Sequence, residues 1–367
     1  MLRQPQHSIV WLFFPHFLLY DRPFVSAESN PMNITILGAG AWGTALAIAL
    51  AQRHNVLLWG RNEAVIAAAS MQRENATYLP GFSLPSNVIV TADFAQAITH
   101  VSASADVNDS LLIVASSVAG LRSLAEQLRG LPLPNIVWLC KGFEEKTRLL
   151  PHQIVRQVLG DAIPAGALSG PSFAQEVARG LPCALAIATD DPGLSERVVA
   201  AVHGCNIRVY STDDMVGVEV GGAVKNITAI ATGVADGLQL GLNARAALIT
   251  RGLAEITRLG IALGGRSETF MGLSGLGDLI LTCTGDLSRN RKVGLGLASG
   301  KSLETVVAEL GHVAEGVRCA SAVRALAQEL GVDMPITNAV AGVLFDGDDP
   351  GAMVELMLAR TPREESA

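Results

Sequence analysis

Several features are scarce in this 367-residue chain, and each scarcity narrows what the protein can be. Only 17% of the residues are charged while 49% are hydrophobic, so the chain collapses into packed cores and is not mainly disordered. The formal net charge is −7, which excludes the broad basic surface of a nucleic-acid-binding protein. The length is sufficient for two domains of ordinary size. We therefore expect a globular protein with no nucleic-acid partner.

Cysteine and lysine are also scarce. The five cysteines include no C-x-x-C pair, and an odd number at wide intervals fits neither a disulfide framework nor a zinc site. We therefore expect free thiols in a reducing compartment, and no metal. Only five of the 27 basic residues are lysine, so a lysine in a functional site is expected to serve for its compact ammonium and its tunable pKa.

The first 31 residues differ in character from the rest of the chain. Ile9–Tyr20 is a 12-residue apolar run that contains Pro15 and His16, and it is too short to cross a bilayer, which needs about 20 residues. A signal peptide is conceivable because Arg3 precedes the run. Met32, however, stands directly before the strand that opens a nucleotide-binding motif. We favour an extraneous or flexible extension over residues 1–31 with the true start at Met32; an ordinary tail and an export signal are the alternatives.

A dinucleotide-binding fingerprint follows at once. Asn33–Leu37 has the composition of a strand, and the turn Gly38-Ala39-Gly40-Ala41-Trp42-Gly43 leads into a helical segment and a second strand. In such a βαβ unit Gly38 permits the turn, Gly40 lets the backbone approach a pyrophosphate and Gly43 lets the helix pack on the strand. The helix N-terminus supplies partial positive charge for the phosphates. The pattern predicts a bound dinucleotide; a glycine turn without a ligand is the alternative.

The end of the second strand bears on the choice of cofactor. An NAD site usually carries an acidic residue there, bonded to the ribose 2′-hydroxyl, but the sequence has Arg61 and no carboxylate. A guanidinium at this position suits the 2′-phosphate of NADP(H). We therefore expect NADPH/NADP as the preferred cofactor, with NADH/NAD also used. Stacking of Arg61 on adenine, which would suit either cofactor, is the alternative.

Strand-like and helical segments alternate as far as about Asp213, and only helical patterns follow. This order predicts an α/β Rossmann-type doubly wound, largely parallel sheet followed by a C-terminal all-α domain. We expect a dinucleotide-binding domain over residues 32–217, a helical substrate domain over residues 218–358 and a tail over residues 359–367. Ligands of such sheets bind beyond the carboxyl ends of the strands, where the sequence places Ser116-Ser117, Lys141-Gly142 and Gly170-Pro171-Ser172.

Lys225 stands out in the helical part. It lies off the apolar stripe of a predicted amphipathic helix, and its neighbours one and two turns away are the small residues Gly221, Ala229 and Thr232. A cation on such a face can be approached closely by another molecule, and its desolvation would lower its pKa into a range useful for acid–base catalysis. The alternative is a surface lysine whose stem lies along the protein.

A second polar cluster lies further along the helical part. A glycine-rich turn precedes Asp278, and Ser288-Arg289-Asn290-Arg291 follows a short run of hydroxyl residues. Arg289 could hold a phosphate as a fork, and Asp278 could orient Lys225 or accept from a substrate hydroxyl. The residue types suit a polyol phosphate; a helix cap with solvated loop charges is the alternative.

These motifs occur together and in the same order in one family. From about Met32 to Leu358 the chain resembles the bacterial NAD(P)-dependent sn-glycerol-3-phosphate dehydrogenases. The resemblance rests on six motifs: Gly38-Ala39-Gly40-Ala41-Trp42-Gly43, Cys140-Lys141-Gly142, Ser169-Gly170-Pro171-Ser172-Phe173-Ala174, Gly221-Gly222-Ala223-Val224-Lys225-Asn226, Gly275-Leu276-Gly277-Asp278-Leu279 and Ser288-Arg289-Asn290-Arg291. It implies a cytoplasmic homodimer without stable membrane insertion that reduces dihydroxyacetone phosphate to sn-glycerol 3-phosphate by reversible hydride transfer at C2, for glycerophospholipid synthesis.

The resemblance also implies roles for single residues, with Lys225 as the catalytic acid–base group. The implied substrate residues are Lys141, Gly170, Ser172, Asp278, Ser288, Arg289 and Asn290. The implied cofactor residues, besides the glycines of the turn, are Ala41, Trp42, Arg61, Lys141, Ala174, Arg289, Val313 and Glu315. Ser116 stands where the family usually has proline, and Cys140 replaces a small or hydroxyl residue. A related hydroxyacid dehydrogenase and a non-catalytic nucleotide sensor are the rival interpretations; the first does not require the last two motifs, and the second would lose Lys225 or Asp278.

Overall fold

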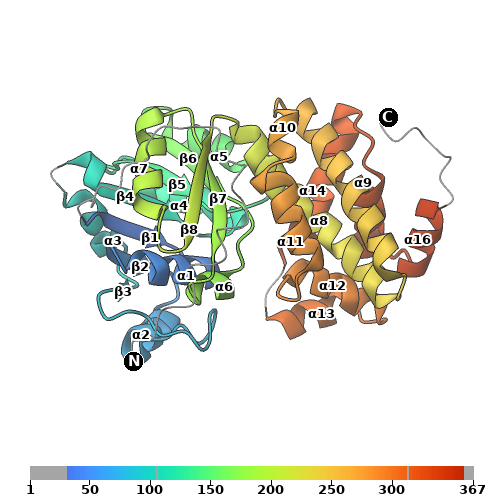
Figure 1. Cartoon of the computed structure of the whole chain (residues 1–367), viewed down its shortest axis with the longest axis horizontal. Helices are drawn as coiled ribbons and strands as arrows, with labels where there is room; N and C mark the ends of the chain where they lie inside the picture. Colours follow the sequence, from blue (N-terminus) through green and yellow to red (C-terminus); the bar gives the residue numbers. More distant parts are fainter. Residues whose placement is uncertain (1–30, 105, 312–313, 359–367) are drawn as a thin grey trace, which may run out of the picture. The chain divides into compact units, whose positions relative to one another are not determined.

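The computed structural model describes residues 31–104, 106–311 and 314–358, and the first half of this part is built on a single eight-stranded sheet (Figure 1). The strand order is β3-β2-β1-β4-β5-β6-β7-β8. The strands are β1 (Asn33–Leu37), β2 (Asn55–Trp59), β3 (Ile89–Thr91), β4 (Ser110–Val114), β5 (Ile136–Trp138), β6 (Ala165–Ser169), β7 (Cys183–Ala188) and β8 (Ile207–Thr212). All neighbouring pairs are parallel except β6 and β7. The predicted doubly wound, largely parallel sheet is confirmed.

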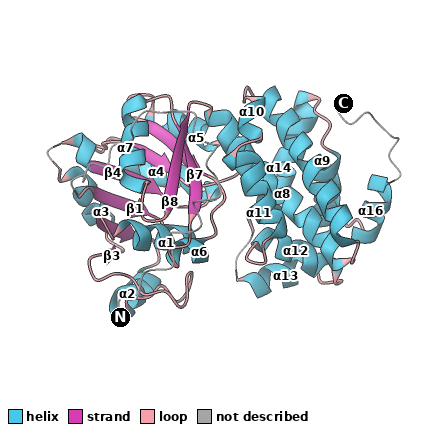
Figure 2. Ribbon diagram, viewed as in Figure 1, coloured by secondary structure: helices cyan, strands magenta, loops and turns pink. Residues whose placement is uncertain are grey.

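Helices cover both faces of this sheet, as the ribbon in Figure 2 shows. Alternate residues of a strand point to opposite faces, and in β4 Leu111 and Ile113 enter one core while Leu112 and Val114 enter the other. The first core also takes side chains of α1 (Ala41–Leu50) and α7 (Pro192–Val202), and the second takes those of α3 (Phe94–Ser102), α4 (Val118–Leu128) and α5 (Pro151–Leu159). Two further helices, α2 (Glu63–Gln72) and α6 (Ala174–Ala178), complete this half.

The strand order changes direction between β1 and β4, and the functional loops lie at this point of the sheet. β1 pairs with β2 on one side and with β4 on the other, so the chain winds outward in opposite directions from this point. The carboxyl ends of β1 and β4 therefore frame a crevice in which doubly wound sheets bind ligands. The glycine turn follows β1, and the loops that carry Ser117, Lys141 and Gly170 follow β4, β5 and β6. The predicted position of these residues at strand ends is confirmed.

The second half is helical and is organised around one long central helix, α8 (Met215–Gly237). The surrounding helices are α9 (Gly241–Ala262), α10 (Ser267–Phe270), α11 (Asp278–Thr284), α12 (Arg289–Ala298), α13 (Leu303–Leu310), α14 (Glu315–Leu330), α15 (Pro335–Ala341) and α16 (Pro350–Leu358). Every residue from Gly217 to Ala235 is buried. The expectation of an amphipathic helix with an apolar stripe was therefore wrong here, because neighbours surround α8 on all sides.

Two more expectations need correction. The predicted glycine-rich turn before Asp278 is a single π-helical turn, Leu273–Gly277, which runs directly into α11. The first helix begins at Ala41, inside the turn that was expected to precede it, because Gly40 has extended backbone and serves as its N-cap. Residues 1–30, for which we expect an extraneous or flexible extension, lie outside the described residues. Among the helices that are described, none is both long enough and apolar enough to span a bilayer.

Candidate active site

The glycine turn after β1 is shaped by two close contacts and one open space. Gly38 has φ +129°, and a Cβ on it would lie 2.6 Å from the carbonyl oxygen of Ala115. A Cβ on Gly43 would lie 2.1 Å from the carbonyl oxygen of Gly38, so α1 can approach the strand only without a side chain there. A Cβ on Gly40 would meet no atom within 4 Å. The space beside Gly40, at the N-terminus of α1, therefore fits an approaching pyrophosphate.

The other predicted cofactor residues lie around this turn or close to it. Ala41 and Trp42 form the first turn of α1 and are half-buried. Ala174 is the first residue of α6, which packs against α1. Arg61 is exposed just beyond β2 and makes no hydrogen bond or ion pair with the residues that the structure describes. Val313 lies outside the described residues.

Two lysines from different halves of the chain meet on one buried carboxylate. Lys225 Nζ, on α8, donates to Asp278 Oδ1 at 2.5 Å, and Lys141 Nζ, in the loop after β5, donates to Asp278 Oδ2 at 2.6 Å. Lys141 Nζ also donates to the Gly170 carbonyl at 3.2 Å. Lys225 is 6% exposed and Asp278 is 1% exposed, so the alternative of Lys225 as a surface lysine is excluded.

Burial and the neighbouring charges set the protonation of this group. Burial lowers the pKa of Lys225 to about 8, although the negative charge of Asp278 acts in the opposite direction. Burial alone would raise the pKa of Asp278, but the positive charges of Lys141 and Lys225 hold it below its usual value. At neutral pH an ionised carboxylate therefore faces two ammonium groups, of which Lys225 can lose its proton near pH 8. The desolvation predicted from the small neighbours of Lys225 is confirmed.

Sequence reasoning missed two polar partners of these residues. Thr282 Oγ1 accepts from Lys225 Nζ at 2.8 Å and donates to the Asp278 carbonyl oxygen at 2.6 Å. Asn226 Oδ1 accepts from Asn290 Nδ2 at 2.9 Å. The spacing could have indicated the first, because residues four apart on a helix, such as Asp278 and Thr282, share a face. Nothing in the sequence indicates the pairing of Asn226 with Asn290.

The predicted phosphate residues lie at the start of α12. Ser288 is buried and its hydroxyl accepts from the backbone N–H of Arg291 at 3.2 Å, so it serves as the N-cap of this helix. Asn290 is also buried, and its Oδ1 accepts from the Gly316 N–H at 2.9 Å. Arg289, between them, is exposed. The helix cap, which the sequence offered as the alternative to a phosphate site, is therefore present, and exposed Arg289 is the first residue of the helix that follows it.

Two predicted residues in the loop after β6 have local partners. Gly170 is buried with φ +143°, and a Cβ there would lie 2.8 Å from the Ala184 carbonyl oxygen. Its own carbonyl oxygen accepts from both Lys141 Nζ and, at 3.1 Å, Ser172 Oγ. This carbonyl is therefore a second acceptor for the Lys141 ammonium, besides Asp278.

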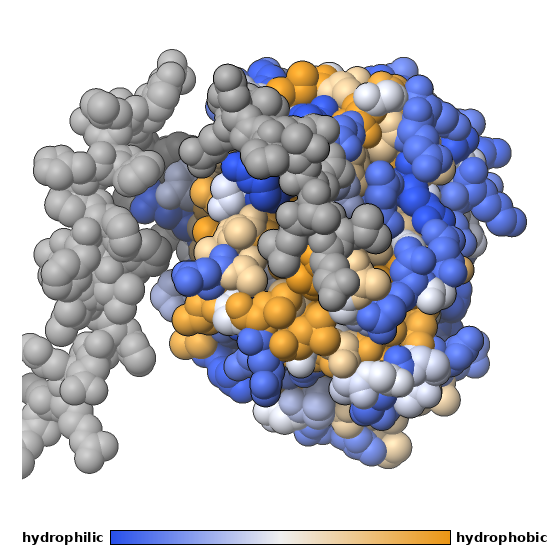
Figure 3. Space-filling model, turned by 90° about the vertical axis from the view of Figure 1, so that its right-hand side faces the viewer, coloured by the Kyte–Doolittle hydropathy of each residue, from blue (hydrophilic) through white to orange (hydrophobic). Residues whose placement is uncertain are grey.

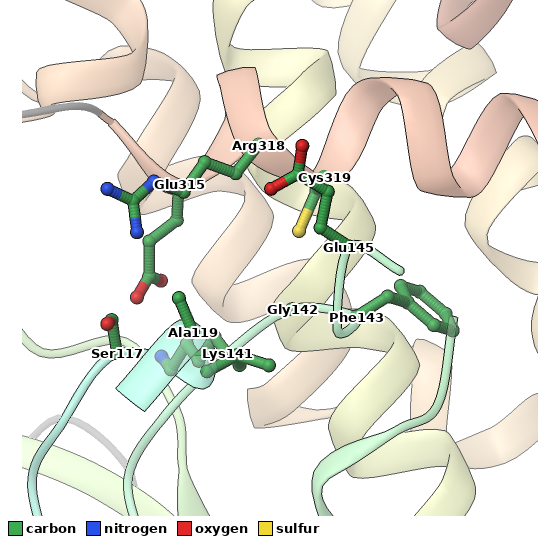
Figure 4. A pocket seen from close by; sticks show the side chains of 10 residues that line it. Ser117, Ala119, Lys141, Gly142, Phe143, Glu145, Glu315, Arg318 and Cys319 are labelled. Atoms are coloured by element: carbon green, nitrogen blue, oxygen red, sulfur yellow. The ribbon is translucent and has the colours of Figure 1, made fainter. Parts of the chain in front are cut away.

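A small hollow of about 30 Å³ adjoins Lys141 between the loops of the sheet and the start of α14. Figure 4 shows Glu315 reaching from α14 toward Ser117 and Lys141, with Arg318 beside it. Burial raises the pKa of Glu315, while Arg289 and the two lysines act to lower it. The hollow thus brings the predicted cofactor residue Glu315 close to the predicted substrate residue Lys141. No group of three or more His, Cys, Asp or Glu side chains suited to a metal ion occurs among the described residues.

The comparisons with known proteins agree with this geometry. The family model described as NAD-dependent glycerol-3-phosphate dehydrogenase N-terminus matches residues 33–195, and the corresponding C-terminus model matches residues 214–355. Two similar relatives are both named glycerol-3-phosphate dehydrogenase, NAD(P)+. The relative from Janthinobacterium sp. (strain Marseille) is 71% identical over 92% of this chain and all of its own length. That from Cupriavidus necator is 59% identical over 91% of this chain and all of its own length.

A solved structure is similar over nearly the same span. The crystal structure of a glycerol-3-phosphate dehydrogenase from Coxiella burnetii superposes with a TM-score of 0.84 at 39% identity, and the match covers 91% of this chain and all of that one. D-mandelate dehydrogenase, at 10% identity and a TM-score of 0.52, shares the fold alone. The chain belongs to the NAD-dependent glycerol-3-phosphate dehydrogenase family.

Proposed function

We propose that this chain reduces dihydroxyacetone phosphate to sn-glycerol 3-phosphate with NAD(P)H, reversibly, and supplies glycerophospholipid synthesis. The observation that carries the proposal is the pair of ammonium groups, Lys225 and Lys141, held on the two oxygens of Asp278 beside the carboxyl ends of the strands. Such a group can donate a proton to an oxygen on which negative charge develops. The family membership supports the same reaction.

Lys225 is the proton donor in this proposal. A bound NAD(P)H supplies a hydride to C2 of the ketone, and the C2 oxygen then needs a proton. Lys225, with its pKa lowered to about 8, is protonated at neutral pH and gives up its proton more readily than an exposed lysine. Lys141 adds a second positive charge at the same place, and Asp278 and Thr282 keep the donor oriented. In the reverse direction the neutral amine of Lys225 accepts the proton from the C2 hydroxyl.

The phosphate of the substrate needs positive charge at some distance from C2. Arg289 and the N-terminus of the ten-residue helix α12 supply it, because the first backbone N–H groups of a helix and a guanidinium both favour phosphate. Asn290, fixed between Asn226 and Gly316, holds this helix start in place. Binding energy at the phosphate then positions C2 at Lys225.

The division of labour follows the two halves of the chain. We propose that residues 32–217 form the dinucleotide-binding domain and residues 218–358 the substrate domain. Val218 packs in a core of the sheet and Val220, two residues on, packs in the core of the helices, so the change of core falls within about two residues of this boundary. Arg61 supports a preference for NADPH over NADH. Five cysteines without a disulfide support a cytoplasmic location.

We further propose that the active form is a homodimer joined through the helical half. Figure 3 shows apolar side chains gathered on the face of this half that lies over α9 and α16. Leu240 and Leu242, at the start of α9, are 41% and 72% exposed, and Ile261 near its end is 53% exposed. These exposed apolar side chains stand at both ends of α9, and an apolar surface of this kind is typical of contact surfaces. Light scattering on the eluting protein tests the dimer, and a monomer at micromolar concentration would contradict it.

The reaction is tested by following NADPH oxidation by the purified protein. We expect turnover when dihydroxyacetone phosphate is added and less than one hundredth of that kcat/KM with dihydroxyacetone, which lacks the phosphate. Small 2-keto acids serve as the comparison for a hydroxyacid dehydrogenase. Turnover of such an acid without turnover of dihydroxyacetone phosphate would overturn the proposal.

A further inference from the structure

A buried carboxylate outside the proposed reaction holds the two halves of the site together. Glu219, on α8, is 5% exposed and stands in an apolar stretch of the helix. Its Oε1 accepts from Trp138 Nε1 at 2.8 Å and from the backbone N–H of His152 at 2.9 Å. Its Oε2 lies 2.5 Å from His152 Nδ1, within hydrogen-bond distance. We call these three residues the Glu219 clasp.

The clasp joins three separate elements. Trp138 is the last residue of β5, His152 is the second residue of α5, and Glu219 lies in the second turn of α8. The N–H of His152 is one of the first four of its helix, which have no partner within the helix. Glu219 satisfies this N–H from another element and places its carboxylate at the positive end of α5.

Stability alone does not explain a carboxylate at this position. Burial raises the pKa of Glu219 despite the hydrogen bonds from His152 and Trp138, which means that the protein opposes its ionisation. Apolar side chains of similar size in such places often give equal or greater stability, whereas a hydrogen-bonded group selects one arrangement of the parts around it. The clasp therefore specifies position more than it adds stability.

The Glu219 clasp lies close in sequence to both lysines of the site, so it bears on the position of Lys225 relative to Lys141. Trp138 precedes Lys141 by three residues, and Glu219 precedes Lys225 by six, which is about 9 Å along a helix. Gly222 lies midway between Glu219 and Lys225 along α8, and a Cβ on it would lie 3.3 Å from both Cγ and Cδ of Lys141. The stem of Lys141 thus lies against α8 one turn beyond the clasp. A slide or rotation of α8 on β5 would move the Lys225 ammonium relative to that of Lys141.

We propose that Glu219 is a positioning residue, which acts through Trp138 and His152 to fix α8 on β5 and so sets Lys225 at the correct distance from Lys141 and from the reacting oxygen. The inference rests on the proposed function, because it assigns Glu219 a part in the same proton transfer. Glu219 touches neither lysine. Its effect on the reaction is therefore one of geometry.

The effect to measure is a loss of kcat without a matching loss of binding. Misplacement of a catalytic group by about 1 Å can cost on the order of 100-fold in rate, so Glu219→Leu should lower kcat by about 10- to 100-fold. The KM for dihydroxyacetone phosphate and the Kd for NADPH should stay within about threefold of the parent, because Arg289 and the glycine turn are not part of the clasp. Rates are expressed per NADPH-binding site, so that unfolded protein does not count.

Conservative replacement distinguishes position from charge. Glu219→Gln keeps an oxygen for Trp138 and the His152 N–H, and its amide can donate to the His152 ring, so we expect kcat within about threefold of the parent. Trp138→Phe keeps an aromatic ring but loses one hydrogen bond, and we expect an intermediate loss of about fivefold. If Glu219→Leu does not fold, the Trp138→Phe and Glu219→Gln pair still decides, because only the first should lose rate.

The pH dependence of kcat is a further measurement, and a variant that only lost stability would leave it unchanged. Lys141 lowers the pKa of Lys225 through its charge, so a change in their separation should displace the basic limb of the kcat profile by about half a pH unit or more in Glu219→Leu. Parent kcat and an unmoved profile in both Glu219→Leu and Trp138→Phe would overturn the inference. Lys225→Ala is assayed beside them as a reference. If the Glu219 and Trp138 variants behave as the parent while the parent turns over and Lys225→Ala does not, only the inference on Glu219 has failed. An inactive parent would mean that the proposed function has failed.

Discussion

The two halves of the molecule bury different kinds of polar group. Among the described residues before Asp214, every buried polar residue is uncharged or a histidine: Thr35, Thr44, His54, Asn75, Ser110, Asn135, Ser169 and Thr189. From Asp214 onward, five acidic or basic residues are buried: Asp214, Glu219, Lys225, Glu255 and Asp278. The sheet half therefore buries neutral polar groups, whereas the helical half also buries ionisable ones.

This difference follows from what each half has to do. A pyrophosphate can be held by backbone N–H groups and a helix N-terminus, which need glycine and close packing but no titratable side chain. Proton transfer to a ketone oxygen needs a group whose pKa lies near the working pH, and burial is how a lysine reaches it. Burial of charged groups in the helical half is unfavourable, and ion pairs such as that of Lys225 with Asp278 offset this desolvation.

Lys225→Ala should have the largest effect. Removal of a positioned proton donor is expected to lower kcat by about 10² to 10⁴-fold, while the Kd for NADPH changes little because the glycine turn lies in the other half. Steady-state kinetics and NADPH fluorescence titration measure the two. Lys301→Ala, which removes an exposed lysine paired with Glu309, is the matched control. A rate within threefold of the parent would show that the proton comes from another group.

Asp278→Asn should come next, with a loss in kcat of about 10²-fold. The two ammonium groups then face each other without a carboxylate. Since the charge of Asp278 raises the pKa of Lys225, its removal should lower that pKa, and the rate of reduction should begin to fall at a lower pH than in the parent. In the parent the reductive rate should fall as the pH rises through about 8. A profile displaced toward higher pH in the variant would contradict this arrangement.

The features of the sheet half could be predicted from the sequence more fully than the contacts of the helical half. The glycine turn, the strands and the polar residues at strand ends were predicted because spacing along the chain specifies them. Of the contacts in the catalytic group, that of Asp278 with Lys225 was one of two roles considered for Asp278, and the structure shows it. The contact of Lys141 with Asp278 was not predicted, since the two residues are 137 positions apart and their contact depends on packing.

The Glu219 clasp and the pairing of Asn226 with Asn290 left no pattern that could be recognised. α8 was expected to be amphipathic because its apolar residues repeat at helical spacing. What the repeat cannot show is that Thr232 and Lys225 also lie inside, since their burial depends on partners from other helices.

Glu255→Gln tests whether the helical half holds a buried carboxyl group with a raised pKa. Glu255 is 2% exposed, and its carboxyl oxygens accept from the N–H groups of Ile336 and Thr337 at the start of α15. Burial raises the pKa of Glu255 from 4.5 to about 7. A group whose folded pKa is raised contributes stability that is complete below its unfolded pKa and is lost as the pH rises through the folded value.

The parent should therefore lose on the order of 3 kcal/mol of unfolding free energy from this group between about pH 5 and pH 8. Thermal or urea unfolding across this range measures it. Glu255→Gln cannot ionise, so the difference between parent and variant should change by that amount over the same range, while Glu304→Gln, at an exposed position on α13, should follow the parent. Parallel curves for the parent and Glu255→Gln would mean that Glu255 keeps an ordinary pKa.

Arg61→Ala tests the sheet half of the molecule. We expect the smallest effect here, and it should concern only the binding of the cofactor. Arg61 is exposed beyond β2 with no partner among the described residues, so its guanidinium is available to a ribose 2′-phosphate. Charge-assisted hydrogen bonds contribute about 1.5–3 kcal/mol, so the Kd for NADPH should rise by roughly 10- to 100-fold. NADH has no 2′-phosphate, and its Kd should change by less than about threefold. Arg156→Ala, at an exposed position on α5, is the matched control. Equal losses for the two cofactors would place Arg61 on the adenine ring, and the preference for NADPH would then have to come from another residue of the sheet half.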